Sequence, residues 1–163
     1  MADGQDPYAA QHMSLVIIHK ALLDNYTTLA TCDVDATQVE RAGPMARFLL
    51  AHHDAESLVL FPFLRKRTRL TSEDVGFLDA REREHRVVHD LCERLLAEAG
   101  APHPSPQELA VVARAIKEVL EPHCAEEERG LTAEHLRAMI APEEIAELVA
   151  EQEAFRAKYP GRI

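Results

Sequence analysis

Apolar residues recur along most of the chain at alternating spacings of three and four, the pattern of helices that bury one face. In the segment from about residue 8 to residue 30, one face carries the large apolar residues Leu15, Ile18, Leu22, Tyr26 and Leu29. Similar segments cover about 36–67, 72–99 and a stretch that begins at residue 105, and a shorter one runs from Pro142 to about Lys158. The pattern predicts four long helices and a shorter C-terminal helix.

Residues with strong positional preferences predict where some of these helices begin and end. Ser105, Pro106 and Glu108 form an N-terminal signature, with Ser as the cap, Pro at the first helical position and Glu three residues after the cap. Gly100 follows the third segment and is typical of a helix C-terminus. We therefore expect a short loop between the third and fourth helices.

Three prolines lie within the predicted helices, where each removes one backbone hydrogen bond. We expect Pro44 to kink the second helix or delay its start, Pro62 to end that helix, and Pro122 to kink the fourth. Short connections between long helices make neighbours antiparallel, so the predicted fold is all-α: an up-down-up-down antiparallel four-helix bundle with an additional C-terminal helix. Residues 8–131 are expected to form the bundle and residues 132–163 a helical extension packed on it.

Length and charge narrow the class of protein. A chain of 163 residues is sufficient for one domain with a real core. Its 28 acidic and 18 basic residues give a formal net charge of −10, which disfavours nucleic acid or an anionic membrane as the main partner. Six glycines and few aromatic residues disfavour a turn-rich β-sandwich or barrel.

The sequence shows no targeting pattern. Residues 1–11 contain neither a basic stretch nor an apolar one of the kind found in signal peptides, and no apolar run is long enough to span a membrane. Three cysteines, an odd number with no zinc-site spacing, are expected to be small thiols in a reducing compartment: Cys32, Cys92 and Cys124. We therefore expect a cytoplasmic protein.

Nine histidines are an unusual number, and five of them fall near the middle of the long helices. The first helix carries His19. Each of the other three carries a pair spaced i, i+4, which places both side chains on one face about 5–6 Å apart at Cβ. The pairs are His52 with Glu56, His85 with His89, and His123 with Glu127.

A single pair of this kind usually lies on the surface, but three pairs and a lone His on four successive helices indicate a shared site. Buried imidazoles and carboxylates without partners would cost several kcal/mol each, and a metal ion satisfies them. Nitrogen and oxygen donors without thiolate suit Fe, Mn or Zn. Five imidazoles and two carboxylates fit a pair of ions better than a single ion.

Four short motifs together resemble one family. They are HHDAE at 52–56, LFP at 60–62, EH at 84–85 and HCAEEE at 123–128. The chain is similar over about residues 13–131 to the hemerythrin-like, HHE cation-binding domain family, whose fold is the four-helix bundle predicted above.

The resemblance implies a ligand set. One iron would be held by His85, His89 and His123. The other would be held by His19 and His52, with Glu56 and Glu127 bridging the two ions, and would keep an open position for dioxygen or a related ligand. The resemblance implies two Fe ions with an oxo or hydroxo bridge, although Mn or Zn would accept the same donors.

The motifs depart from oxygen-carrying hemerythrins at the last carboxylate. Those proteins have an Asp five residues after its His, whereas here Glu127 follows His123 by four residues and Glu128 by five. The departure disfavours an oxygen-carrier role and resembles the broader HHE branch, which includes iron sensors, nitric-oxide and peroxide handling proteins and iron-centre repair factors. Whether Glu128 substitutes as a ligand stays open.

The other histidines have separate expectations. His12 lies two turns before His19 on the same face, so it is either a neighbour of the site or a substitute ligand. His53 lies about 100° from the ligand face and is expected on the flank of its helix. His103 and His135 lie near loops and are expected to be exposed.

The function predicted from these observations is a non-haem di-iron protein that binds O₂, peroxide or nitric oxide in a binding, sensing or storage role. One alternative is a di-iron oxidase or peroxide-consuming enzyme, for which Tyr26 and Cys124 are the nearest candidate relay groups. Another is an iron-responsive regulatory module, with the C-terminal segment as a surface for a protein partner.

Overall fold

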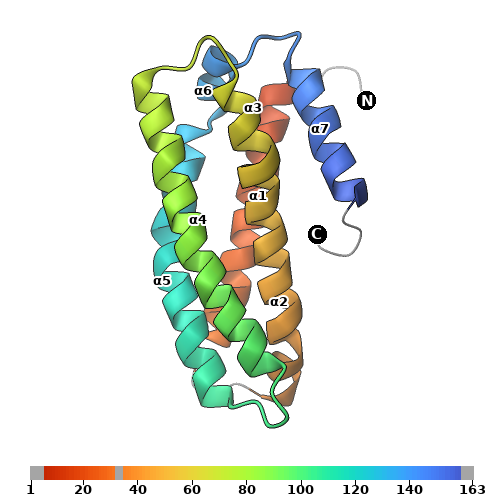
Figure 1. Cartoon of the computed structure of the whole chain (residues 1–163), viewed down its shortest axis with the longest axis vertical. Helices are drawn as coiled ribbons and strands as arrows, with labels where there is room; N and C mark the ends of the chain where they lie inside the picture. Colours follow the sequence, from red (N-terminus) through yellow and green to blue (C-terminus); the bar gives the residue numbers. More distant parts are fainter. Residues whose placement is uncertain (1–5, 32–34, 159–163) are drawn as a thin grey trace.

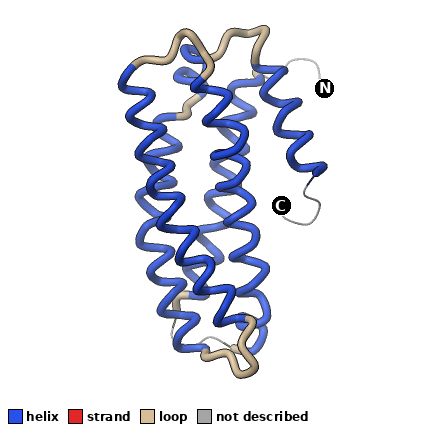
Figure 2. The backbone as a smooth tube through the Cα atoms, viewed as in Figure 1, coloured by secondary structure: helices blue, strands red, loops and turns tan. Residues whose placement is uncertain are grey.

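Four long helices form an antiparallel bundle in the computed structural model, which describes residues 6–31 and 35–158. They are α1 (Pro7–Leu29), α2 (Ala36–Ala55), α4 (Ser72–Ala99) and α5 (Pro106–Gly130). Figure 1 shows them running down, up, down and up along the long axis of the molecule. Figure 2 shows no strand in the described part of the chain. The predicted all-α bundle with a further C-terminal helix is confirmed.

Every long helix begins with a side chain that caps its free backbone N–H groups. Asp6 and Asp35 cap α1 and α2, and Thr71 caps α4. The predicted signature at the start of α5 is confirmed, because the Glu108 N–H donates to Ser105 Oγ at 3.2 Å.

The prediction that Pro62 ends the second helix is wrong. After Ala55 the chain continues through a π-helical turn, η1 (Glu56–Leu60), into the short helix α3 (Phe61–Arg65). The Phe61 N–H donates to the Glu56 carbonyl, five residues earlier. Because a proline crowds the carbonyl four residues before it, this wider turn allows the helix to continue through Pro62. Pro44 lies inside α2 and does not delay its start.

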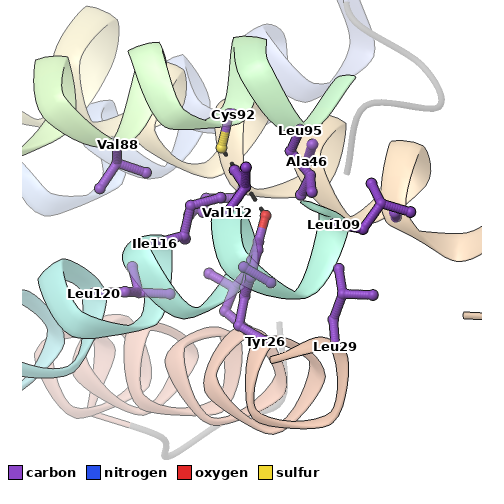
Figure 3. Close-up of a cluster of buried hydrophobic side chains, with 14 of the residues drawn as sticks. Tyr26, Leu29, Ala46, Val88, Cys92, Leu95, Leu109, Val112, Ile116 and Leu120 are labelled. Carbon is purple, nitrogen blue, oxygen red and sulfur yellow. Dashed lines mark hydrogen bonds between the residues drawn. The ribbon is translucent and has the colours of Figure 1, made fainter. Parts of the chain in front are cut away.

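Two apolar clusters fill the bundle, and a layer of polar side chains separates them. The lower cluster, toward the loop between α4 and α5 at the bottom of Figure 1, includes Tyr26, Ala46, Leu95 and Leu120 (Figure 3). The upper cluster is formed by other residues, among them Leu15, Leu60, Phe63, Leu78 and Leu131. The helices α1 and α4 thus pass from one apolar cluster to the other through the polar layer, and α2 and α5 reach the upper cluster through the residues that follow them.

The C-terminal part of the chain adds two helices to the upper half of the bundle. The helix α6 (Ala133–Met139), which the sequence pattern did not separate, contacts α1, while α7 (Ile145–Lys158) contacts η1 and α2. The Tyr8 hydroxyl donates to the Ile140 carbonyl at 2.9 Å, and the Gln11 side chain donates to Gln152 at 2.6 Å. These bonds join the N-terminal turns of α1 to the C-terminal segment.

Two further features of the described residues are the character of the helices and the state of the cysteines. Among the described residues, no helix combines the length and the apolar character that crossing a bilayer requires. Cys92 and Cys124 are buried free thiols, as expected, whereas Cys32 lies outside the described residues. Burial raises the pKa of the Cys92 thiol to about 12.

Candidate metal centre

The polar layer gathers seven imidazole and carboxylate side chains at one level of the bundle. All are between 0% and 7% exposed. They come from every long helix and from η1: His19 of α1, His52 and His53 of α2, Glu56 of η1, His85 of α4, and His123 and Glu127 of α5. These polar residues lie on the same buried helix faces, here called seams, as the residues of the apolar clusters, and they are therefore buried with them.

The ligand atoms fall into two overlapping groups, each with atoms within 4.8 Å of one another. The groups are His19, His52, Glu56 and Glu127, and His53, Glu56, His85 and His123. Glu56 belongs to both, since its Oε1 lies 3.2 Å from His52 Nε2 and its Oε2 lies 3.4 Å from His85 Nε2. Its two oxygens therefore face the two groups separately.

Glu127 provides a second link between the groups. Its Oε2 lies 3.3 Å from His19 Nε2 and 3.5 Å from His123 Nε2. The two carboxylates thus come from different helices and each contacts imidazoles of both groups. This is the arrangement that two adjacent, carboxylate-bridged ions require.

Hydrogen bonds on the outer side of three imidazoles fix their orientation. The Nδ1–H of His19 donates to Glu128 at 2.9 Å, and the Nδ1–H of His123 donates to Glu84 at 2.8 Å, because an ionised carboxylate only accepts. Ser57 Oγ and His85 Nδ1 share a hydrogen bond of 2.8 Å. The Nε2 atom of each ring is left to face the centre, as in metal sites whose histidines bond outward through the other nitrogen.

Glu84 is itself held in place. The buried Arg81, one turn earlier on α4, donates from Nη2 to Glu84 Oε1 at 2.8 Å, while the other Glu84 oxygen accepts from His123. These two hydrogen bonds fix the direction of the Glu84 side chain. Glu84 therefore orients the imidazole of His123. Glu128 orients His19 in the same way and lies outside both ligand groups.

The inward-facing atoms of the centre have no hydrogen-bond partner among the described residues. They are Nε2 of His19, His52, His85 and His123, both ring nitrogens of His53, and both carboxylate oxygens of Glu56 and of Glu127. A buried polar atom without a partner costs about 1–3 kcal/mol. Metal ions placed among these atoms would satisfy them together, and the nitrogen and oxygen donors suit Fe, Mn or Zn. The residues therefore fit a metal centre.

Burial controls the protonation of three of the imidazoles. It lowers the pKa of His52 to about 3 and that of His85 to about 4, and it lowers the pKa of His53 well below its usual value. Neighbouring imidazoles add to the effect at His52 and His53. These rings are neutral at physiological pH, which is the form that binds a metal.

The two carboxylates differ. Burial, reinforced by the charge of Glu127, raises the pKa of Glu56 well above its usual value. Burial also disfavours ionised Glu127, but the close approach of the His123 and His19 imidazoles outweighs it and lowers the pKa of Glu127. Burial would lower the pKa of these two imidazoles, but the neighbouring carboxylates, Glu127 first and then Glu56, raise it above the usual value. Burial thus favours the protonated form of Glu56, whereas Glu127 is held ionised beside His19 and His123.

The structure brings six of the seven predicted ligands together and does not bring His89. His89 is exposed on α4, and the buried residues of that helix show why: Leu78, Arg81, His85, Val88, Cys92 and Leu95. Their spacing alternates between three and four, so the core position after His85 is Val88 rather than His89. The i, i+4 spacing alone did not distinguish the two, whereas the apolar seam of the same helix does.

The expectation that His53 lies on a helix flank is wrong. Its imidazole is buried in the centre, and its ring stacks on His85 with centroids 3.9 Å apart. The seam of α2 passes through Ala42, Ala46 and Leu49, and the next steps of four and three residues reach His53 and Glu56. This periodicity was the sequence signal for His53. His52, beside it, is buried as well.

The remaining histidines and relay candidates lie outside the two ligand groups. His12 is half-buried, and its Nδ1 lies 3.1 Å from the Leu131 carbonyl, so its ring bonds the backbone. His103 and His135 are exposed, as expected. The Tyr26 hydroxyl lies in the lower apolar cluster, 4.0 Å from Cys92 Sγ.

Two pockets reach the centre from different sides. A mostly apolar cavity of about 80 Å³ between α1, α2 and α7 is lined at the centre by His52 and Glu56, which belong to the first ligand group. A larger and more polar pocket of about 500 Å³ between α2 and α4 is lined by His53 and His85, which belong to the second. The apolar cavity thus reaches His52 of the first group and the shared Glu56, and the polar pocket reaches two imidazoles of the second group.

Comparison with known proteins agrees with this geometry. The hemerythrin HHE cation-binding domain matches residues 12–134, a range that includes every residue of both ligand groups. No curated protein and no solved structure matches the chain. The match covers most of the chain and the whole cation-binding site, and the chain therefore belongs to the hemerythrin HHE cation-binding family.

Proposed function

We propose that this protein is a non-haem di-iron protein that reversibly binds dioxygen or a related small molecule, such as nitric oxide or peroxide, in a sensing, storage or binding role. The observation that carries the proposal is the pair of overlapping ligand groups that share Glu56. A single ion would use only one group and leave buried donors of the other without a partner. Two ions would use both.

The two positions have unequal protein ligands. The first group contains two imidazoles, His19 and His52, whereas the second contains three, His53, His85 and His123. The two groups share Glu56, and Glu127 approaches an imidazole of each. An ion in the first position therefore has fewer nitrogen donors and is the one expected to accept an external ligand.

The apolar cavity lies beside this first position. Leu15, Ile18 and Phe48 line it together with His52 and Glu56. A volume of about 80 Å³ is smaller than the roughly 150 Å³ cavity that holds benzene, so the space suits a molecule of a few atoms. Bound iron would supply the coordination position and the electrons for such a ligand. Apart from Gln11, Ser14, Gln152 and Arg156, the rest of the lining is apolar and offers no group that delivers protons, which favours reversible binding over turnover.

The polar pocket beside the second position is the observation that favours the alternative function, an enzyme. An oxidase or peroxide-consuming enzyme needs a route for protons, and Asp54 and Glu82 line that pocket beside His53 and His85. Both candidate functions use the same metal centre. They differ in whether a bound ligand is released unchanged or consumed repeatedly.

The experiment that tests the proposal starts from protein purified anaerobically and reconstituted with ferrous iron. We expect about two iron ions per chain and an optical spectrum that changes on adding O₂ or nitric oxide and reverts when the gas is removed. A metal content near zero or one with ample iron would contradict the di-iron centre. Peroxide or oxygen consumption far above the iron concentration would instead support the enzyme, and a spectrum that no gas alters would favour the iron-responsive module.

A further inference from the structure

The polar pocket between α2 and α4 has features that the binding of a small gaseous ligand does not explain. It is about 500 Å³ in volume, several times the apolar cavity, and it is lined by charged side chains of both helices. On its inner side are His53 and His85, which are buried members of the second ligand group. On its outer side are the exposed His89 and Asp90.

We propose that this pocket is the route by which divalent metal ions load the centre, and that His89 with Asp90 forms a capture site at its mouth. The proposal rests on the metal centre proposed above. It assigns His89 a transient contact with the incoming ion in place of a permanent one, and it predicts an effect on the rate of loading rather than on the final metal content.

Charge favours a cation in this pocket. Three carboxylates line it, from Asp54, Glu82 and Asp90, against one guanidinium, from Arg86. Glu82 also accepts a 3.2 Å hydrogen bond from Arg65, so part of its charge is neutralised. A cleft lined with an excess of one charge raises the local concentration of the opposite ion and increases its association rate. The apolar cavity on the other side offers a hydrated dication no such attraction.

Helix geometry places successive imidazoles along the route. His89 follows His85 by four residues on α4, so the two side chains leave neighbouring turns of one helix about 5–6 Å apart at Cβ. An ion held by His89 is therefore one short step from His85. His53, whose ring stacks on His85, lines the same pocket.

The state of His53 is an independent observation that points to a metal ion in this pocket. It is 5% exposed, and neither of its ring nitrogens has a hydrogen-bond partner among the described residues. A buried imidazole with two unused nitrogens at the inner end of a polar pocket is suited to take an ion from outside. Exposed acidic residues without such an acceptor would be an ordinary solvated surface.

Stopped-flow loading of the metal-free full chain with Co²⁺ tests the proposal, because Co²⁺ bound by imidazoles absorbs visible light. The variants are His89→Ala and Asp90→Asn. The matched controls are His103→Ala, which removes an exposed imidazole elsewhere, and Gln152→Ala at the apolar cavity. We expect the two pocket variants to load about tenfold more slowly, within the range that electrostatic steering gives, with an unchanged final spectrum and metal content.

Salt provides a second readout. Raising the ionic strength should slow loading of the wild type more than loading of Asp90→Asn, because screening removes the attraction that this variant already lacks. Loading rates in His89→Ala and Asp90→Asn equal to those of the controls would overturn the route. A lower final metal content in His89→Ala would overturn it too, since His89 would then be a permanent ligand. A wild-type chain that takes up no Co²⁺ and no Fe²⁺ would instead contradict the metal centre itself.

Discussion

The imidazole rings of His53 and His85 lie nearly parallel, with centroids 3.9 Å apart and planes inclined by 13°. Two neutral imidazoles stacked in this way present their nitrogens at one level, although they come from α2 and α4. The Phe61 ring is also nearly parallel to that of His85, with centroids 5.5 Å apart and planes inclined by 16°. These two ring contacts restrict the orientation of His85, and the first brings His53 into the same ligand group.

His53→Ala should therefore remove metal, whereas His89→Ala should not. His53 supplies one of three imidazoles at the second position, and its loss leaves His85 and His123 with Glu56. We expect about one ion per chain in His53→Ala and about two in His89→Ala, measured by elemental analysis after dialysis. His103→Ala is the control for removing an exposed imidazole. Loss of metal from His89→Ala alone would contradict this assignment and would support His89 as the metal ligand paired with His85.

Loss of either carboxylate should damage the centre more than loss of one imidazole. Glu56 and Glu127 each contact imidazoles of both ligand groups, and each can neutralise part of the charge of two ions. We expect Glu56→Ala and Glu127→Ala to retain fewer than one ion per chain in the same assay. Glu126→Ala, an exposed neighbour on α5, is the matched control and should retain two. Equal losses in all three variants would contradict the assignment.

Glu84→Gln should weaken metal binding without removing a ligand. Gln keeps the shape of the side chain but accepts a weaker hydrogen bond from the His123 Nδ1–H, and it loses the ionic contact with Arg81. Changes of this kind cost about 10–100-fold in metal affinity. Competition with a chelator of known affinity would measure the change. Glu82→Gln, on the same helix, contacts Arg65 instead of a ligand imidazole and serves as the control.

The helices and the antiparallel topology of the bundle could be predicted from the sequence. The spacing of apolar residues indicates helices, and short connections between long helices make neighbouring helices antiparallel. An i, i+4 spacing does not show whether both histidines of a pair are buried. The buried residues of a helix follow one another at alternating steps of three and four, so a residue four positions after a buried one can be exposed. Val88 takes the core position that a repeated step of four would give to His89. The π-helical turn η1 is a further case, because Pro62 alone indicates a break. The structure resolves it as a wider turn that continues the helix and carries Ser57, the hydrogen-bond partner of His85.

The buried thiol of Cys92 should make the fold less stable in alkali. Burial raises its pKa in the folded chain to about 12 from an ordinary value of 9.0, so between these values the unfolded chain releases a proton that the folded chain keeps. Stability is therefore lost as the pH rises above about 9. Chemical denaturation at pH 8 and pH 10 should show a smaller decrease for Cys92→Ala than for the wild type. An equal decrease in both would show that other groups control the alkaline limit.

Removal of the metal should loosen α1 more than any other long helix. The helices α2 and α5 each carry two members of the centre, with Glu56 directly after α2, while α1 contributes only His19 and α4 only His85. These two single-ligand helices differ in their packing. The helix α4 packs closely against both α2 and α5, whereas α1 packs chiefly against α5 and makes few contacts with α2. The ions therefore supply a larger share of what holds α1 in place.

A ligand present at a thousand times its dissociation constant stabilises the folded state by about 4 kcal/mol, which in a domain of this size corresponds to roughly 8–16 °C in melting temperature. Chelation should lower the melting temperature by an amount of that order. Hydrogen exchange should become faster at residues 15–23 of α1, around His19, and change least in the lower half of α4, where Cys92 and Leu95 lie in the apolar cluster. The metal-free chain keeps both apolar clusters, so it should loosen rather than unfold. If chelation changed neither the melting temperature nor exchange at these residues, the seven buried polar side chains would be satisfied without an ion, and the metal-organised core would be wrong.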